Sequence, residues 1–410
     1  MIEYRQIKQI EKQVDKYIDK MKGISDFLFK NPELGGEEYI ASKYLIDIAD
    51  KMGFRTVENY CGLDTAFMAE FQNGQGPVLA VVVEYDALPG FGPDGSLAHA
   101  CGHNWISAVG MGTAMIMSEM KDEFSGTLRL LGTPAMENLG CKAEMIKAHA
   151  FDDVDVVIQS HLEHYTTVAC KFLALDAIEF KFRGRASHAS SSPEEGINAL
   201  DAVQFMFIGV NALRPYLGSG IKIHGVISEG GEAPSVIPDI AACKYYIRAD
   251  SRKQLETIKP KIIRCAEGAA LMAGAEMTMS YVENPHDDML NLPLLQKTAE
   301  QYIVNEGIRI NEDYESIAGF SSADIGNVSH VCPTLYMEFD VEANKDFRVH
   351  DKIALNYVNS EYSLKKLKQV SKIMAEVLME LYNNQELVED IKKEHGKMMR
   401  EKAVCESKMI

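Results

Sequence analysis

The 410-residue sequence predicts an α/β protein with a mixed, mostly parallel sheet that is flanked by helices and interrupted by an inserted α+β module of ferredoxin-like topology. Two observations lead to this fold class. Short, almost entirely apolar runs alternate with helix-like segments in the first and last thirds of the chain, whereas the middle follows the order β-α-β-β-α-β. At roughly 100–200 residues per domain, the length agrees with two or three domains.

The outer thirds of the chain contain the predicted elements of the first domain. Strands buried on both faces, as in parallel sheets, have continuous apolar runs rather than an alternating pattern. Such runs occupy residues 78–83, 127–131, 154–158 and 334–337. Apolar residues at helical spacing predict helices over residues 7–21, 107–120 and 364–377. We interpret the charged residues 392–410 as a frayed helix or a tail.

The middle third has the composition of a separate module. Strands are predicted at residues 175–182, 221–227, 241–247 and 276–282, and helices at 194–213 and 254–272. This order predicts that one domain is inserted into another. Residues 1–173 and 286–410 then form the first domain, and residues 174–285 form the inserted one.

Composition and charge argue against several classes of protein. The hydrophobic share of 46% and the charged share of 25% are typical of globular proteins. A formal net charge of −18 disfavours contact with phosphate backbones and anionic lipids, so neither nucleic acid nor a membrane is an expected partner. The sequence has no apolar stretch of membrane-spanning length and no apolar signal segment, and none of its eight cysteines forms a CxxC pair. We therefore expect a cytoplasmic protein.

Side chains that can bind metal ions follow three of the predicted strands. Cys101 and His103 flank a single glycine after the first apolar run, Glu137 follows the second run, and His161 follows the third. Because parallel strands place their carboxyl ends at one edge of a sheet, these donors can meet in one crevice. Sulfur, nitrogen and oxygen donors together suit zinc, manganese or a related divalent ion. From spacing alone, a metal site and purely structural roles for these residues both remain open.

Six segments form an ordered set of motifs over nearly the whole chain. They are EYDALPG, HACGHN, GTPAMEN, AFDDVDVVIQSH, GRASHASSSPEEGINALDA and SSADIGNVSH. Their content and order resemble the aminoacylase and carboxypeptidase family of metallopeptidases (peptidase family M-twenty), in the branch of hippurate hydrolases, N-acyl-amino-acid amidohydrolases and aminobenzoyl-glutamate hydrolases. The resemblance implies a catalytic α/β domain with two adjacent divalent ions, zinc or manganese. It also implies an inserted lid domain through which two copies form a homodimer.

The resemblance implies roles for individual residues as well. The implied metal ligands are Cys101, His103, Glu137, His161 and His350. Asp86 would orient the site from behind the ligands, and His188 in the lid would reach the active site of the partner subunit and polarise the substrate carbonyl. Asn198 and Arg248 are candidates for holding a carboxylate on the amino-acid half of the substrate, and structural roles for both also remain open.

One position departs from the family pattern at the general base. Where the family has Ala-Glu-Glu, this chain has Ala135-Met136-Glu137, so that Met136 stands at the position of the base. A thioether cannot carry a proton, and a positioned general acid or base typically contributes about 10²–10⁴-fold to the rate. Three explanations remain open: an inactive relative that binds an amino-acid derivative, replacement of the base by Glu163 or His164, or a base that the substrate supplies.

A second departure lies in the inserted domain. Ser235 stands where relatives have the asparagine of an Ala-Pro-Asn motif, so a short hydroxyl replaces an amide donor. Altered substrate choice and neutral change both explain this difference. The motif content as a whole predicts a metal-dependent amidohydrolase that cleaves a small-molecule amide, namely an N-acyl amino acid, a dipeptide or an aminobenzoyl-glutamate-like compound. The alternative is a catalytically impaired member of the family that acts as a ligand-binding or subunit protein.

Overall fold

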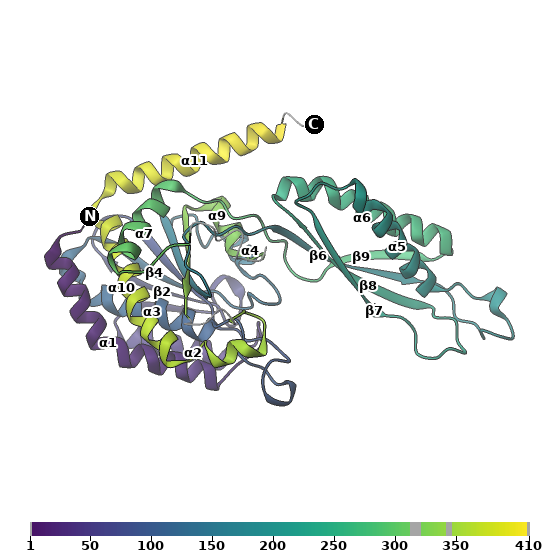
Figure 1. The fold of residues 1–410 in the computed structure, drawn as a ribbon, viewed down its shortest axis with the longest axis horizontal. Helices are drawn as coiled ribbons and strands as arrows, with labels where there is room; N and C mark the ends of the chain where they lie inside the picture. Colours follow the sequence, from purple (N-terminus) through teal and green to yellow (C-terminus); the bar gives the residue numbers. More distant parts are fainter. Residues whose placement is uncertain (1, 312–320, 342–346, 408–410) are drawn as a thin grey trace. The chain divides into compact units, whose positions relative to one another are not determined.

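The computed structural model describes residues 2–311, 321–341 and 347–407. The chain divides into two compact units (Figure 1). The first unit comprises Met1–Lys171, Met289–Phe320 and Asn327–Ile410, and the second comprises Phe172–Asp288 and Ser321–Gly326. Each unit has its own hydrophobic core.

The first unit is built on a six-stranded sheet with the strand order β1-β2-β4-β3-β5-β10. The strands are β1 (Arg55–Glu58), β2 (Phe67–Asn73), β3 (Val78–Val83), β4 (Gly126–Gly132), β5 (Val156–Glu163) and β10 (Thr334–Asp340). β4, β3, β5 and β10 are parallel, whereas β2 pairs antiparallel with both β4 and β1. The predicted mixed, mostly parallel sheet is confirmed, and β3 begins and ends at the residues that its apolar run predicts.

Helices cover this sheet. They are α1 (Tyr4–Lys30), α2 (Tyr39–Lys51), α3 (His103–Glu119), α4 (Lys142–Lys147), α7 (Pro293–Asn305), α9 (Ile325–Val331), α10 (Glu361–Asn383) and α11 (Gln385–Ser407). α3 packs against β3, β4 and β5 on one side and against α1 and α10 on the other, so it is buried along most of its length. A side chain at Gly110 would overlap with Val83, which explains how closely α3 approaches the sheet.

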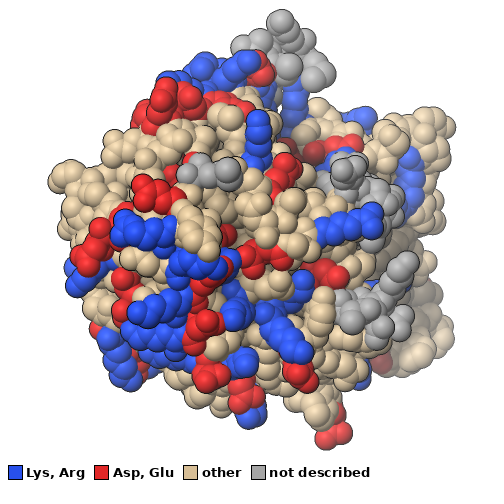
Figure 2. Space-filling view, turned by 60° about the vertical axis from the view of Figure 1, so that its left-hand side comes forward, with Lys and Arg blue, Asp and Glu red and all other residues tan. Residues whose placement is uncertain are grey.

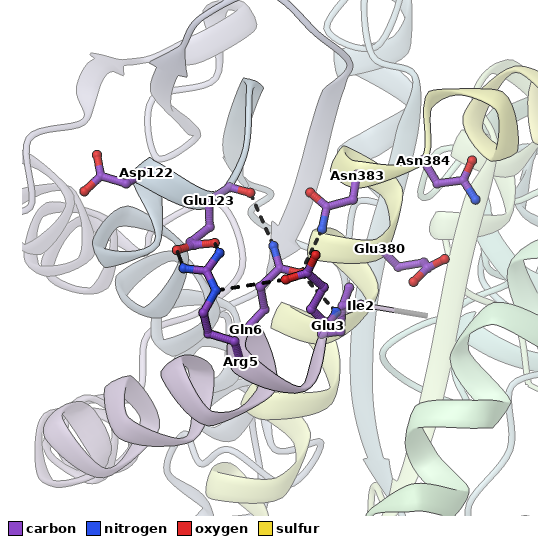
Figure 3. A pocket seen from close by; sticks show the side chains of 9 residues that line it. All are labelled: Ile2, Glu3, Arg5, Gln6, Asp122, Glu123, Glu380, Asn383 and Asn384. Carbon is purple, nitrogen blue, oxygen red and sulfur yellow. Dashed lines mark hydrogen bonds and ion pairs between the residues drawn. The ribbon is translucent and has the colours of Figure 1, made fainter.

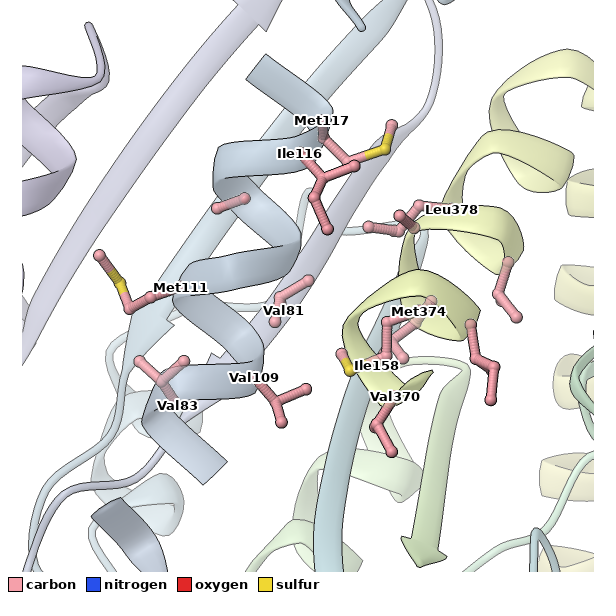
Figure 4. Close-up of a cluster of buried hydrophobic side chains, with 14 of the residues drawn as sticks. Val81, Val83, Val109, Met111, Ile116, Met117, Ile158, Val370, Met374 and Leu378 are labelled. Carbon is pink, nitrogen blue, oxygen red and sulfur yellow. The ribbon is translucent and has the colours of Figure 1, made fainter. Parts of the chain in front are cut away.

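The core between α3, α10 and the central strands consists of aliphatic and methionine side chains (Figure 4). Val81 and Val83 of β3, Ile158 of β5 and Met374 of α10 all belong to this cluster. Each fully buried side chain of this kind contributes about 1.5–3 kcal/mol relative to its exposed state. This packing holds the ends of β3 and β5 and the start of α3 in fixed relative positions.

One prediction for the first unit needs correction. The strand predicted to end at residue 158 continues to Glu163 because residues 334–340 pair with residues 157–163 in parallel register. His161 therefore lies within a strand rather than after one. Of the two interpretations of the charged residues 392–410, the structure favours the helix: α11 runs from Gln385 to Ser407, and its Val388 and Ile391, which precede the charged residues, are buried in the core.

The second unit has the topology β6-α5-β7-β8-α6-β9, which confirms the predicted ferredoxin-like module. Its elements are β6 (Ala174–Arg183), α5 (Ala199–Leu213), β7 (Lys222–Glu229), β8 (Ile240–Ala249), α6 (Arg252–Ala273) and β9 (Glu276–Tyr281). The antiparallel sheet has the order β7-β8-β6-β9, and α5 and α6 pack on it and on each other. α5 starts five residues later than predicted, because Asn198 caps it by accepting a hydrogen bond from the Leu200 N–H.

The surface carries charges of both signs. Figure 2 shows Lys and Arg side chains interspersed with Asp and Glu over the face of the described residues that it presents, without a continuous basic area. Among the helices in the described ranges, none has both the length and the apolar character that a bilayer crossing requires.

Candidate metal centre

A tight turn between β3 and α3 places two donors side by side. Cys101 and His103 are both buried, and His103 is the first residue of α3. Gly102 between them has a φ of +75°, and a side chain there would overlap with Leu162 of β5. The turn therefore depends on glycine for both its conformation and its close approach to the neighbouring strand.

Three further donors reach the same place from distant parts of the chain. Glu137 follows β4 in a loop where Ala135 has a φ of +56°. His161 projects from β5, which is next to β3 in the sheet. His350 also has a positive φ, +60°, and its N–H donates a hydrogen bond of 3.0 Å to the carbonyl of Ala100. This bond holds the otherwise unrelated His350 segment against the Cys101 turn.

The five donors form two groups that have one member in common. The ligand atoms of Cys101, His103 and His161 all lie within 4.8 Å of one another, as do those of Cys101, Glu137 and His350. The Cys101 Sγ belongs to both groups, which is the arrangement expected of a thiolate shared between two ion positions. The structure therefore brings together every residue that the sequence predicts as a metal ligand.

Asp86 sets the orientation of two of these donors. Its Oδ1 lies 2.6 Å from the Nδ1 of His103, and its Oδ2 accepts a hydrogen bond of 2.9 Å from the N–H of Glu137. The Nδ1 of His161 is likewise 2.8 Å from the carbonyl oxygen of Leu162. In both histidines Nδ1 is thus the donor, and the lone pair of Nε2 faces the cluster.

The buried polar atoms test whether a cation fits here. Within the described part of the chain, His103 Nε2, Glu137 Oε1 and Glu84 Oε2 are buried without a hydrogen-bond partner. Leaving such atoms unsatisfied costs about 1–3 kcal/mol each, and more for a charged group. His103 Nε2 lies 3.6 Å from Glu137 Oε1 and 3.7 Å from Glu84 Oε2. A cation between these atoms would satisfy them, so the residues fit a divalent ion.

The pKa values of these groups show that the donor cluster favours positive charge. Burial disfavours the imidazolium of His103, yet the carboxylates of Asp86, Glu84 and Glu137 raise its pKa to about 10. Burial also opposes the charge of Glu137, but the hydrogen bond from His350 and the charge of His103 lower its pKa to about 2. Protons on His103 and His350, whose pKa values are both raised, therefore compete with an ion for the same negative charge.

The position expected for the general base carries no group that can exchange protons. Met136 is half-buried between Ala135 and Glu137. Glu163 lies two residues beyond His161 on β5, and side chains two apart in a strand project from the same face. Its Oε2 is 3.0 Å from the Nδ1 of His164. The nearby Glu338 of β10 is buried, and burial together with the charge of Glu163 raises its pKa to about 8.

The predicted lid residues lie in the second unit. His188 forms an isolated bridge with Val236, and the N–H of Ala189 donates to the carbonyl of Ser235 at 2.9 Å, so His188 and Ser235 are neighbours. The N–H groups of Ser190 and Ser191 lie 3.3 and 3.2 Å from the Nδ1 of His188. With Nδ1 as acceptor, the proton of a neutral ring resides on Nε2, and the exposed His188 can donate it to a ligand.

The other two predicted substrate contacts have structural partners. Asn198 caps α5, as described above. Arg248 lies on β8, where its Nε donates to the Oγ of Ser322 at 3.3 Å and its guanidinium group lies 5.3 Å from the ring centroid of Tyr246. These contacts leave a substrate role for both residues as a prediction.

A separate pocket of about 520 Å³ lies in the first unit between the start of α1 and the end of α10 (Figure 3). Its residues are Ile2, Glu3, Arg5, Gln6, Asp122, Glu123, Glu380, Asn383 and Asn384. None of the five donors lines it. Arg5, the single cation among the described residues that line it, donates two hydrogen bonds of 2.7 Å to Glu123.

Sequence reasoning assigned no role to three buried groups at the centre, namely Glu84, Lys142 and Glu338. Glu84 and Lys142 form an ion pair with a distance of 2.6 Å although they are 58 residues apart. A signal for Glu84 was present, because it lies two residues before Asp86 and directly after a buried strand. No sequence pattern pointed to its pairing with Lys142.

Sulfur, nitrogen and carboxylate donors lie together at the ends of parallel strands, in a chain that also contains an inserted ferredoxin-like module. This combination indicates a metal-dependent hydrolase. The model of Peptidase family M20/M25/M40 matches residues 80–380, and the chain belongs to this family. The predicted family is thereby confirmed, and so is the predicted activity: the protein is a metal-dependent hydrolase of amide bonds.

Curated relatives with named activities match most of the chain. The Xaa-Arg dipeptidase of Mus musculus is 32% identical over 344 residues, which are 80% of this chain and 78% of the relative. One of the two subunits of the p-aminobenzoyl-glutamate hydrolase of Escherichia coli is 29% identical over 77% of this chain and 64% of the relative.

Solved structures share the fold. An aminobenzoyl-glutamate utilization protein from Klebsiella pneumoniae superposes with a TM-score of 0.72 and 20% identity, covering 92% of this chain and 98% of that one. A dinuclear metal binding peptidase of the same family from Bacillus subtilis gives a TM-score of 0.63 at 18% identity, covering 89% and 99%.

Proposed function

We propose that the protein binds two divalent ions, zinc or manganese, and hydrolyses the amide bond of a dipeptide or an N-acyl amino acid, including aminobenzoyl-glutamate-like amides. The observation that carries this proposal is the pair of donor groups that share Cys101. Three nitrogen, one sulfur and one carboxylate donor suit these ions. The names of the relatives, an Xaa-Arg dipeptidase and an aminobenzoyl-glutamate hydrolase, support this substrate class.

In this proposal the chain's own residues position the reacting groups and move the proton. When bound, the ions would supply Lewis acidity and an acidified water. Asp86 fixes the ring of His103 and the backbone of Glu137. Glu163 takes the proton-transfer role that Met136 cannot perform, because it projects from the same strand face as His161. His164 holds the carboxylate of Glu163 through the 3.0 Å contact.

The second unit supplies the remaining substrate contacts in this proposal. His188 of one subunit would donate from Nε2 to the substrate carbonyl at the active site of the partner subunit, next to the hydroxyl of Ser235, and Asn198 and Arg248 would lie near the substrate carboxylate. A homodimer through this unit is supported by the edge strand β7, whose Val226 and Ile227 are 62% and 49% exposed. A cytoplasmic location is supported by seven of the eight cysteines, which the structure describes as free thiols, and by the thiol that the centre requires.

The test is amine release from a panel of substrates by zinc- or manganese-loaded protein. The panel contains Xaa-Arg dipeptides, other dipeptides, N-acyl amino acids and aminobenzoyl-glutamate. Turnover that a chelator abolishes and added metal restores is the expected result. Two bound ions per chain should accompany it in elemental analysis. Protein that binds no divalent ion at micromolar concentration would contradict the proposal.

Met136 favours a second candidate function, a family member that binds an amino-acid derivative and turns it over slowly or not at all. Saturable binding of a panel compound by the metal-loaded protein, without amine release, is the result that this candidate requires. Turnover by the natural protein at rates usual for enzymes, about 1–10³ per second, would rule it out.

A further inference from the structure

Glu84 is a buried carboxylate at the centre with only one of its two oxygens engaged. It directly follows β3, and its side chain is 1% exposed. Its Oε1 accepts a hydrogen bond of 2.6 Å from the Nζ of Lys142, whose side chain is completely buried. Its Oε2 has no hydrogen-bond partner among the residues that the structure describes. The ion pair with Lys142 thus accounts for the burial of Oε1, whereas the burial of Oε2 needs another explanation.

The free oxygen points at the donor cluster. Glu84 Oε2 lies 3.7 Å from the Nε2 of His103, which is also buried without a partner in the described ranges. This distance is too long for a hydrogen bond, but it is close to the separation of two ligands of one ion. Two atoms at 2.0–2.2 Å from a tetrahedral ion lie roughly 3.4 Å apart.

Glu84 and Asp86 act on opposite ends of the same imidazole ring. Asp86 Oδ1 binds the Nδ1 of His103, on the side away from the cluster, whereas Glu84 Oε2 faces the Nε2 that is directed into it. Glu84 also interacts electrostatically with the other two members of the first donor group, His161 and Cys101. Glu84 Oε2 therefore lies on the Nε2 side of the ring, where an ion would bind, whereas Asp86 lies on the opposite side, behind the ligand.

We propose that Glu84 is the fourth protein ligand of the ion held by Cys101, His103 and His161, with Lys142 holding its carboxylate in place from behind. This inference rests on the metal centre of the proposed function and goes beyond the ligand set that the family resemblance implies. Four protein ligands close a zinc-like site, whereas the group of Cys101, Glu137 and His350 has three and leaves a position for water or substrate. The first ion is then held tightly, and the second is the one that exchanges.

Zinc binding to the metal-free protein tests this assignment. Competition with a chromophoric chelator measures the affinity of each binding step, and elemental analysis gives the number of ions. The parent is expected to bind two zinc ions, one more tightly. The substitution Glu84→Gln should weaken the tight step by 10-fold or more and change the weaker step by less than 3-fold. Glu376→Gln, at a buried glutamate of α10 outside the cluster, should change neither step.

Because Glu84→Gln removes the carboxylate charge that pairs with Lys142, a double variant serves to separate zinc binding from an effect on folding. Glu84→Gln combined with Lys142→Met removes both charges, and a melting temperature near that of the parent would show that it folds. It should show the same loss at the tight step. Lys142→Met alone keeps the ligand, so it should retain more zinc affinity than the double variant.

A crystal structure of the zinc-loaded parent provides a measurement without any substitution. Anomalous scattering should locate an ion at 2.0–2.2 Å from Glu84 Oε2. An ion farther than 3 Å from this atom, or a tight step that Glu84→Gln leaves unchanged, would overturn the assignment while two bound ions still support the proposed function. A parent that binds no zinc would instead contradict the proposed function itself.

Discussion

The Nδ1 of His103 lies 2.6 Å from the Oδ1 of Asp86, and both side chains are shielded from solvent. The second oxygen of Asp86 binds the backbone N–H of Glu137, so one carboxylate connects the start of α3 with the loop after β4. Asp86 thereby couples the orientation of a nitrogen ligand to that of an oxygen ligand. The metal affinity of the centre should depend on this residue although it does not face the ion.

The substitution Asp86→Asn should therefore weaken zinc binding by about 10–100-fold, the usual effect of losing a partner behind a metal ligand. The amide keeps the shape of the side chain, but it cannot accept both hydrogen bonds as a charged group. Chelator competition measures the affinity, and Asp122→Asn on an exposed turn is the matched control. Unchanged affinity in Asp86→Asn would show that the contact is only structural.

Cys101 belongs to both donor groups, so its replacement should affect both ions. In Cys101→Ser, a hydroxyl that stays protonated replaces the thiol, and both zinc-binding steps should weaken by at least 10-fold. Cys332→Ser is the control, because Cys332 is also buried but its Sγ donates to the carbonyl of Val154 instead of facing the cluster. Loss of only one binding step in Cys101→Ser would mean that the thiolate is not shared.

Substitutions that add a carboxylate at Met136 or remove the carboxylate of Glu163 test which residue transfers the proton. Met136→Glu places a carboxylate at the position of the base. It should raise kcat by about 10²–10⁴-fold if no other group of the natural protein transfers the proton, but by much less if Glu163 already transfers it. Met136→Gln, which cannot carry a proton, is the control for size and polarity. Zinc content should be the same in all variants.

The companion variant Glu163→Gln should lower kcat by about 10²–10⁴-fold at unchanged zinc content. Adding Met136→Glu to it should restore activity. Full activity in Glu163→Gln alone would exclude Glu163 as the group that moves the proton. It would then leave His164 or the substrate as the remaining sources.

Glu376 should make the stability of the protein depend on pH, away from the metal centre. It is 3% exposed on α10, and burial raises its pKa to about 7 even though Lys372 lies 3.7 Å away. The folded state holds this proton more tightly than the unfolded state, whose pKa is about 4.3. The contribution to stability is thus fully present below about pH 4.3 and is lost as the pH rises through about 7.

In Glu376→Gln this loss should be absent. Between pH 5 and pH 8, the free energy of unfolding of the metal-free parent should fall relative to the variant by roughly 2–3 kcal/mol. Lys372 keeps Glu11 and Glu306 as partners, so the substitution leaves no stranded cation. Urea unfolding at several pH values measures the difference. A difference that is constant with pH would show that Glu376 is ionised in the folded state over the whole range.

Local sequence patterns were sufficient for the fold class and for Cys101, His103, Glu137 and His161 as candidate donors, whereas only the family resemblance pointed to His350. The apolar run of β3 predicted a doubly buried strand with the bounds that the structure shows, because a strand covered on both faces has no polar side to interrupt the run. The antiparallel strands β1 and β2 escaped prediction, since each exposes part of its length and shows no such run. β5 was predicted too short because its polar end is covered only through pairing with β10.

The amino-acid sequence by itself determined the central strands of the sheet, the inserted ferredoxin-like module and the motif that places Cys101, Gly102 and His103 in one turn. These features depend on neighbouring residues, whose hydrophobic period and backbone preferences act locally. Only the tertiary structure decided that His350 reaches Cys101 through the carbonyl of Ala100, and that Lys142 occupies one oxygen of Glu84 while the other faces His103. Such contacts join residues that are far apart in the chain, and the packing of α3 against the sheet determines which of their atoms meet.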